Sequence, residues 1–138
     1  MQVLNVAFGG RLAQDLPGHR TVQKDQRLVS SYHSIRVQAN TKLGKIVGAE
    51  IFKYVNSRHH QGVGKSQVSP SLVASAFCPI DGLIEGLESP THRWVIGVQC
   101  HPEREDEVPQ NLLHLFDEFL RQARDYAGST YVKEPSAK

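Results

Sequence analysis

The sequence predicts an α/β domain, and three features of the chain support this prediction. Residues 94–98 are a continuous apolar run of strand length, residues 72–87 have the pattern of a β-hairpin, and residues 109–127 have helical periodicity. The 138 residues leave room for one domain. Hydrophobic residues make up 39% and charged residues 22%, a globular balance that argues against a disordered or fibrous chain.

The chain begins with a predicted short helix over residues 1–8. Its apolar residues recur at helical spacing: Val3, Leu4, Ala7 and Phe8. The helix starts without a polar or capping residue and stops at Gly9-Gly10, a pair that is typical of helix ends. We therefore expect it to be the second half of an element whose first half is absent from this chain.

The next part of the chain alternates between polar segments and predicted regular elements. Residues 11–26 are polar and predict an excursion outside the core. Residues 28–37 alternate between apolar and polar side chains, which indicates a half-buried strand. Residues 41–47 predict one or two helical turns, and residues 51–55 predict a second strand.

The last elements are a hairpin, a buried strand and a long helix. Two apolar segments flank an Asp-Gly turn at residues 79–82, which predicts an antiparallel pair. Residues 94–98 have no polar alternation and are expected to be buried on both faces. The helix from Pro109 to Gly128 should bury a stripe formed by Leu112, Leu115, Phe116, Phe119, Leu120 and Ala123. Residues 1–128 then form the domain and residues 129–138 a loose tail.

Charge and cysteine content argue against several classes of function. Lys plus Arg is 16 and Asp plus Glu is 14, so a formal charge of +2 gives no electrostatic reason to expect a nucleic-acid partner. No apolar run approaches the ~18–20 residues of a membrane helix, and no signal peptide is evident. Two cysteines are too few for a disulfide framework. We therefore expect a cytoplasmic protein without a nucleic-acid or membrane partner.

The strongest candidate site is Gly97-Val98-Gln99-Cys100-His101-Pro102-Glu103, where the predicted buried strand ends. Pro102 favours an extended His101, so His101 and Glu103 should lie on the same side of the chain. A carboxylate beside an imidazole fixes its tautomer and stabilises the imidazolium, as a general base requires. A strand-terminal histidine beside a solvated glutamate is the alternative interpretation. Cys100 should point away from His101 and act as a buried structural thiol.

A second polar cluster contains the adjacent histidines His59 and His60, in the loop after a predicted strand. Adjacent histidines usually point apart, and the ligand spacing of a structural zinc site is absent, so no metal site is predicted. Hydrogen bonding in a pocket, or plain loop polarity, accounts for them better. Cys78 has no histidine near it in the sequence and is also interpreted as structural. Glu85 and Glu88 are expected only to decorate a strand.

The chain resembles the class I glutamine amidotransferase-like peptidases, and more narrowly the γ-glutamyl-γ-aminobutyrate hydrolase family, also called peptidase family C26. The segments that carry this resemblance, in chain order, are residues 2–10, His33, residues 55–61, residues 81–88 and residues 97–103. The resemblance implies a three-layer, flavodoxin-like fold with the β-hairpin, of which this chain would be the C-terminal part. It covers residues 1 to about 127.

The resemblance also implies roles for individual residues. Family members use a Cys-His-Glu triad, which places the base on His101 and its orienting carboxylate on Glu103. Gln2 matches the last residue of the family's nucleophile elbow, so the nucleophilic cysteine would lie three residues upstream of Met1. His59 and His60 would border the substrate pocket with Gln2. Cys100 is a departure, since the family usually has an aromatic residue there.

The implied reaction is hydrolysis of a γ-glutamyl amide through a thioester, without a cofactor or metal. Because the nucleophile is not in this sequence, we expect the chain alone to be inactive on its small-molecule γ-glutamyl substrate. The absent strands would leave apolar surface exposed, so self-association or a partner that supplies them is expected. The alternatives are a pseudoenzyme that serves as a binding module and a non-functional gene remnant.

Overall fold

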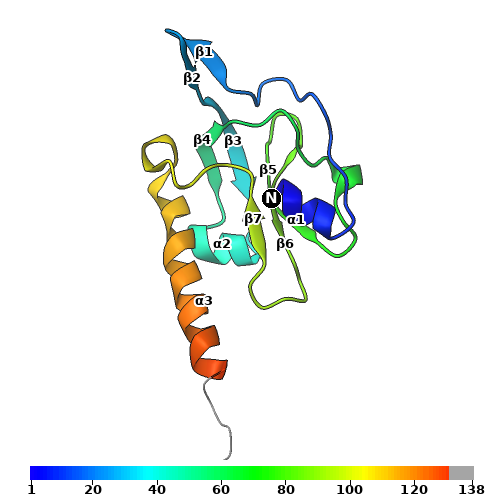
Figure 1. Cartoon of the computed structure of the whole chain (residues 1–138), viewed down its shortest axis with the longest axis vertical. Coiled ribbons are helices and arrows are strands. Elements are labelled where there is room, and N and C mark those ends of the chain that lie inside the picture. The colour runs from blue at the N-terminus through cyan, green and yellow to red at the C-terminus, as the bar shows by residue number, and fades with distance from the viewer. Residues whose placement is uncertain (131–138) are drawn as a thin grey trace, which may run out of the picture.

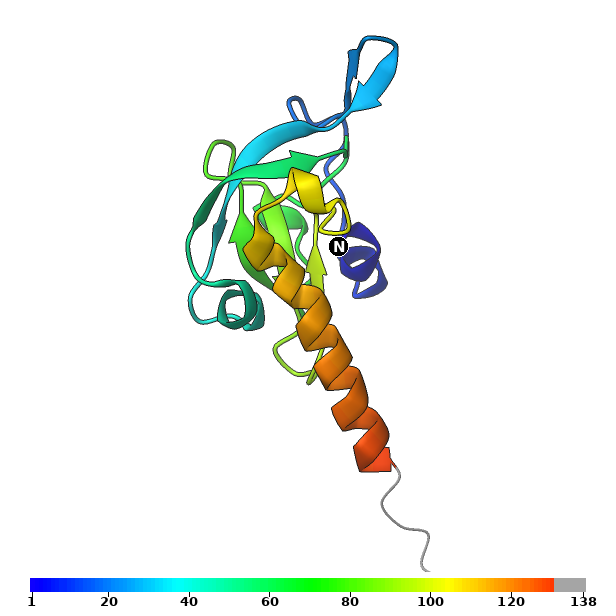
Figure 2. The ribbon, with the colours of Figure 1, turned by 90° about the vertical axis from the view of Figure 1, so that its left-hand side faces the viewer.

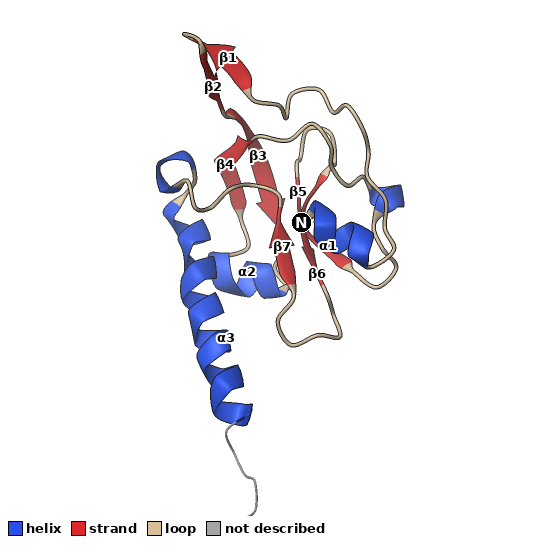
Figure 3. Ribbon diagram, viewed as in Figure 1, coloured by secondary structure: helices blue, strands red, loops and turns tan. Residues whose placement is uncertain are grey.

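The computed structural model describes residues 1–130 and has a five-stranded sheet with helices on both faces (Figures 1 and 3). The helices are α1 (Gln2–Ala7), α2 (Lys42–Val47) and α3 (His114–Thr130). The strands are β1 (Val22–Lys24), β2 (Arg27–Val29), β3 (Ser31–Val37), β4 (Ile51–Ser57), β5 (Val73–Phe77), β6 (Ile84–Glu88) and β7 (Ile96–Val98). Short 3-10 turns cover Lys65–Gln67, Glu105–Glu107 and Gln110–Leu113.

Within residues 1–130 the main sheet has the strand order β4-β3-β5-β6-β7, and its neighbouring strands pair antiparallel. The predicted hairpin is confirmed as β5 and β6, with Val73 opposite Glu88. Gly82 has a φ of 72°, a backbone conformation that glycine adopts without strain, so the turn forms where the Asp-Gly pair predicts it. Strands β1 and β2 form a separate hairpin that projects from the domain (Figure 1).

The two faces of the sheet carry separate hydrophobic cores, which makes the fold a three-layer α/β arrangement. Helix α2 and the segment leading into α3 cover the first face, where the buried residues are Ile35, Val37, Leu43, Val47, Phe52, Val55, Ala76, Cys100, Val108 and Leu112. Helix α1 covers the other face, where Met1, Leu4 and Phe8 pack on Val63, Leu72, Ile84 and Leu87. The predicted fold class is therefore confirmed.

Helix α2 shows how local sequence sets the ends of an element. The Thr41 hydroxyl accepts a hydrogen bond from the Gly44 N–H at 2.9 Å, which satisfies a backbone donor of the first turn. The helix ends at Gly48, whose φ of 91° favours glycine. Both ends agree with the prediction for residues 41–47.

Three details of the predicted packing are wrong. Strand β7 is only partly buried because it is the last strand of the sheet in the described residues. In α1, Val3 is 83% exposed, since Met1, Leu4 and Phe8 form the packed side. The predicted α3 stripe is buried only near its start: the exposed members are Phe116, Phe119, Leu120 and Ala123. Figure 2 shows the reason, because α3 runs past the end of the sheet.

The C-terminal end of the domain also differs from the expectation. Helix α3 continues through Gly128 to Thr130. The predicted loose tail at residues 129–138 lies, beyond Thr130, outside the described residues. Within residues 1–130, the longest helix is too short and too polar to cross a bilayer.

Candidate functional site

His101 and Glu103 lie together just after β7, with Glu103 Oε1 2.7 Å from His101 Nδ1. The predicted contact is confirmed, but its backbone is a turn: the Arg104 N–H donates to the His101 carbonyl at 3.1 Å, with Pro102 at the position where proline favours turns. The two side chains are 43% and 59% exposed, so a small molecule in solution can reach them. Slight burial raises the pKa of Glu103, but hydrogen bonds from its own backbone and from His101 hold it below its usual value.

Asn56 on β4 fixes the backbone of His101 from both sides. Its Oδ1 accepts from the His101 N–H at 2.8 Å, and its Nδ2 donates to the His101 carbonyl at 2.9 Å. Asn56 is buried, so water does not compete for these two bonds. Asn56 lies in the segment 55–61 that carries the family resemblance, but this role was not predicted, because Asn56 and His101 are 45 positions apart.

Glu107 joins the support of this turn to the neighbouring strands. Its carboxylate accepts from the Ser30 hydroxyl at 2.6 Å and from Arg104 at 2.6 Å, with Asn56 Nδ2 at 3.4 Å. The hydrogen bond from Arg104 is the main cause that lowers the pKa of Glu107 to about 2. Glu107 is therefore ionised at neutral pH and remains so in moderately acidic solution. Its hydrogen bonds to Arg104 and Ser30 hold the segment after His101 against the end of β2.

Gln2 connects α1 to the same region. Its Nε2 donates to the Gln61 carbonyl at 2.7 Å and to Gln99 Oε1 at 3.2 Å. Gln99 directly precedes Cys100 and His101 in the chain. Gln2 thus ties the first turn of α1 to the loop after β4 and to the segment that carries His101.

The adjacent histidines point to different surroundings, as predicted. His59 is buried and its Nδ1 is 2.9 Å from the Gln61 carbonyl, whereas His60 is exposed. Burial is the main cause that lowers the pKa of His59 to about 4, so its ring is neutral at ordinary pH. Both border an open polar hollow of about 360 Å³ that also contains Arg20 and Arg58.

Neither cysteine is placed as a nucleophile. Both Cys78 and Cys100 are buried, and within residues 1–130 no hydrogen bond joins either thiol to His101. Burial is the main cause that raises the pKa of Cys100 to about 12, and burial also raises the pKa of Cys78. Both thiols are therefore protonated at ordinary pH, as structural cysteines are.

Glu85 and Glu88 are not surface decoration, and that expectation was wrong. The Glu88 carboxylate accepts from the backbone N–H groups of Lys42 and Leu43 at 2.9 and 3.1 Å, which stabilises the start of α2. Glu85 is buried on the strand β6, beside buried histidines. Burial raises its pKa well above the usual value.

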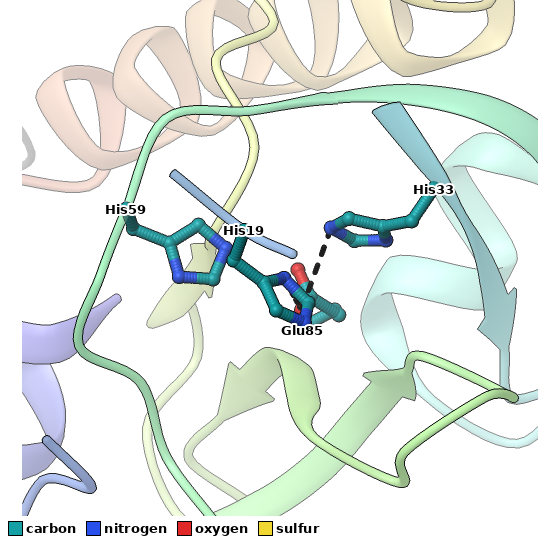
Figure 4. Close-up of side chains that lie close together, drawn as sticks. All are labelled: His19, His33, His59 and Glu85. Carbon is teal, nitrogen blue, oxygen red and sulfur yellow. Dashed lines mark ion pairs between the residues drawn. The ribbon is translucent and has the colours of Figure 1, made fainter. Parts of the chain in front are cut away.

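The histidine cluster consists of His19, His33, His59 and Glu85, whose potential ligand atoms all lie within 4.8 Å of one another. Figure 4 shows the His19 ring between those of His59 and His33, with Glu85 beside it. Imidazole nitrogens and a carboxylate oxygen are suitable ligands for a divalent metal ion. This cluster was not predicted from the sequence, because its members come from four separate segments.

Comparisons with known proteins agree on one family. Residues 1–103 match the family described as Peptidase C26. The chain is 37% identical over 142 residues to "Putative glutamine amidotransferase Rv2859c" of Mycobacterium tuberculosis, covering 97% of this chain and 41% of that protein. It is 36% identical over 128 residues to Protein NtpR of Enterococcus hirae, covering 88% of this chain and 52% of the relative. The chain thus spans about half, or less, of these two relatives.

A solved structure shows the same fold. The glutaminase domain of Trypanosoma brucei CTPS with bound acivicin superposes with a TM-score of 0.51 at 18% identity, covering 75% of this chain and 44% of that chain. At this identity the likeness concerns the fold alone. It agrees with the three-layer arrangement and the antiparallel strands described above.

Proposed function

We propose, because the chain belongs to the peptidase C26 family, that it supplies the general base and the substrate-binding loops of a γ-glutamyl amide hydrolase. The observation that carries this proposal is the exposed His101–Glu103 pair, 2.7 Å apart and fixed by Asn56. An accessible imidazole that is oriented by a carboxylate is the arrangement that hydrolysis by a thiol nucleophile requires.

In the proposed reaction a cysteine thiolate attacks the amide carbonyl, and His101 protonates the leaving amine as the C–N bond breaks. His101 then takes a proton from the water that hydrolyses the thioester. Glu103 holds the imidazole and stabilises its protonated form. Cys78 and Cys100 are buried and protonated, so the nucleophile comes from a cysteine outside these 138 residues.

The polar hollow beside His60 supports the substrate class. Asp15, Arg20 and Arg58 border it, and Arg20 is already paired with Asp15 at 2.6 Å. The Arg58 guanidinium, which donates one hydrogen bond to the Ser30 hydroxyl, therefore remains to bind a carboxylate. The γ-glutamyl group carries an α-carboxylate that fits such a hollow. His59 and His60 border the same hollow, whereas Gln2 orders the adjacent loop through the Gln61 carbonyl.

The test begins with the DNA upstream of the Met1 codon. An in-frame segment that encodes a cysteine three residues before Met1 supports the hydrolase, and the longer polypeptide should then hydrolyse γ-glutamyl amides. We expect no turnover from the 138-residue chain alone, and a loss of about 10⁴-fold or more in the longer polypeptide on His101→Gln. His114→Gln, an exposed histidine at the start of α3 and outside the polar hollow, is the matched control for the base and should retain turnover.

Three results would overturn the proposal. Turnover by the 138-residue chain itself would contradict the assignment of the nucleophile to residues outside it. A stop codon or unrelated DNA upstream, together with γ-glutamyl ligand binding by the short chain, would favour the binding module instead. Full activity of the His101→Gln variant would remove His101 from the chemistry.

A further inference from the structure

The histidine cluster of His19, His33, His59 and Glu85 is separate from the exposed His101–Glu103 pair and joins four segments of the chain. His19 lies in the loop between α1 and β1, His33 lies on β3, His59 follows β4 and Glu85 lies on β6 (Figure 4). All four residues are more than nine-tenths buried at the side chain or residue level. The His19 ring centroid is 4.6 Å from that of His33 and 4.8 Å from that of His59.

Each imidazole has one ring nitrogen held by an acceptor outside the cluster. His19 Nε2 is 2.8 Å from Asp81 Oδ2, His33 Nδ1 is 3.2 Å from the Ser34 carbonyl, and His59 Nδ1 is 2.9 Å from the Gln61 carbonyl. A carboxylate or carbonyl oxygen accepts only, so these three nitrogens carry the proton. In the neutral rings the other nitrogen then has an unprotonated lone pair.

These lone pairs converge on the same buried space without a donor. His33 Nε2, His59 Nε2 and Glu85 Oε1 are buried and have no hydrogen-bond partner. His19 Nδ1 is 3.5 Å from the Ser57 hydroxyl, which donates instead to the His19 carbonyl at 2.9 Å. Buried acceptors without partners are costly, so their accumulation at one point favours the binding of a cation there.

Without a cation, no single group satisfies the cluster. A proton on Glu85 supplies one donor for three imidazole lone pairs and a water molecule supplies two, so both would be needed together. Protonating the histidines would place like charges within 4.8 Å of one another in a buried site. A single divalent cation accepts all four lone pairs at once and neutralises the carboxylate.

The structure assigns to His19 Nδ1, His33 Nε2, His59 Nε2 and Glu85 Oε1 the ligand set of a Zn²⁺ ion. Three imidazole nitrogens and one carboxylate oxygen complete a tetrahedral zinc site. Glu85 Oε1 is 3.8 Å from both His19 Nδ1 and His33 Nε2, whereas zinc bonds of ~2.0–2.1 Å place neighbouring ligand atoms about 3.4 Å apart. These two pairs need a contraction of a few tenths of an ångström, and the remaining ligand atoms, which lie within 4.8 Å of one another, must approach by up to about 1.4 Å.

The outer partners of the three rings resemble the supporting shell of known metal centres. Metal-bound histidines commonly donate their other N–H to a carboxylate or a backbone carbonyl, as His19, His33 and His59 are placed to do here. With four protein ligands the site has no open position, which is typical of structural zinc. The ion would therefore cross-link the loops that contain His19 and His59 to strands β3 and β6.

A second group of possible ligands, His19, Cys78 and Asp81, is less suitable. His19 Nε2 already contacts Asp81, which leaves that nitrogen protonated. Burial raises the pKa of Cys78, so its thiol is not a ready thiolate ligand. Asp81 serves better as the outer partner that orients His19.

The test is titration of the metal-free 138-residue chain with Zn²⁺, followed by calorimetry, and with Co²⁺, followed by visible absorption. We expect one equivalent of Zn²⁺, a rise in melting temperature, and the intense visible bands of four-coordinate Co²⁺. His33→Gln and His59→Gln should each weaken zinc binding by more than about 100-fold, and Asp81→Asn by about 10–100-fold. His60→Gln, which removes the exposed neighbour of His59, should bind zinc as the unaltered chain does.

Several outcomes would overturn the assignment. They are the absence of zinc binding to the folded chain, a six-coordinate Co²⁺ spectrum, and unchanged binding in His33→Gln and His59→Gln. Loss of binding in His101→Gln alone would place the metal at the exposed pair instead. Circular dichroism of each metal-free variant shows whether it folds, and the Co²⁺ spectrum of the unaltered chain decides the geometry without any substitution. None of these measurements depends on hydrolase activity.

Discussion

The molecule pairs histidine with glutamate in two regions, and the two differ in almost every physical respect. His101 and Glu103 make a 2.7 Å contact while 43% and 59% exposed. His33 and Glu85 lie 3.8 Å apart with side chains only 7% and 2% exposed. The exposed pair is satisfied by itself and accessible to solvent, whereas the buried set has acceptors without hydrogen-bond partners. In the two proposals above, the same residue types thus serve proton transfer in one place and cation binding in the other.

The largest change in unfolding free energy is expected for Asn56, the buried residue that fixes the backbone of the exposed pair. Asn56→Ala removes both hydrogen bonds to the His101 backbone and leaves their partners unpaired, so we expect a loss of about 2–3 kcal/mol in unfolding free energy. Urea denaturation measures it. Asn111→Ala is the matched control: Asn111 makes one 3.3 Å bond to the Val47 carbonyl and should cost under about 1 kcal/mol. Equal losses would contradict the role of Asn56.

A substitution in the histidine cluster should raise the unfolding free energy, whereas Asn56→Ala should lower it. In the metal-free chain burial raises the pKa of Glu85, and its protonated form can donate one hydrogen bond, whereas Glu85→Gln supplies an amide whose NH₂ group can donate to both His19 Nδ1 and His33 Nε2. We expect the unfolding free energy, measured in the presence of a chelator, to rise by about 1 kcal/mol, while the response to added Zn²⁺ is lost. A destabilised variant that still responds to zinc would show that Glu85 faces a donor and not the metal.

The contribution of Glu107 to the stability of the turn that carries His101 should appear as a loss of unfolding free energy in acid. The pKa of Glu107 is lowered to about 2, so its carboxylate contributes stability above the ordinary glutamate pKa near 4.5 and loses it as pH falls toward 2. After allowance for solvent screening we expect about 1 kcal/mol to disappear over this window. Glu107→Gln should flatten this part of the pH profile of unfolding free energy, and Glu105→Gln, at an exposed neighbouring position, should leave it unchanged.

The sequence predicted well what depends on neighbours in the chain. The hairpin follows from its Asp-Gly turn, the start of α2 from a capping residue at Asn40 or Thr41, and the His101–Glu103 contact from a spacing of two residues. Even there the contact forms through a turn and not through the extended backbone that was assumed.

What the sequence could not predict depends on contacts between distant segments. Asn56 reaches His101 across 45 positions. The histidine cluster draws on four segments whose spacing follows no ligand motif. The burial of Glu85 and Glu88 follows from the place of β6 inside the sheet, which no local pattern reveals. The predicted stripe on α3 failed for a related reason, since periodicity shows an apolar face but not what covers it.

The smallest effect is expected for Glu103→Gln, the counterpart of Glu85→Gln in the exposed region. Surface ion pairs contribute little because water already solvates both groups, so the unfolding free energy should change by less than about 0.5 kcal/mol. The same variant should change the tautomer of His101, because Gln can donate to Nδ1 where the carboxylate only accepts. The ¹⁵N signals of the imidazole report the tautomer. A tautomer shift without a stability change would mark Glu103 as a positioning residue. A large stability loss would instead give the pair the structural role that its exposure argues against.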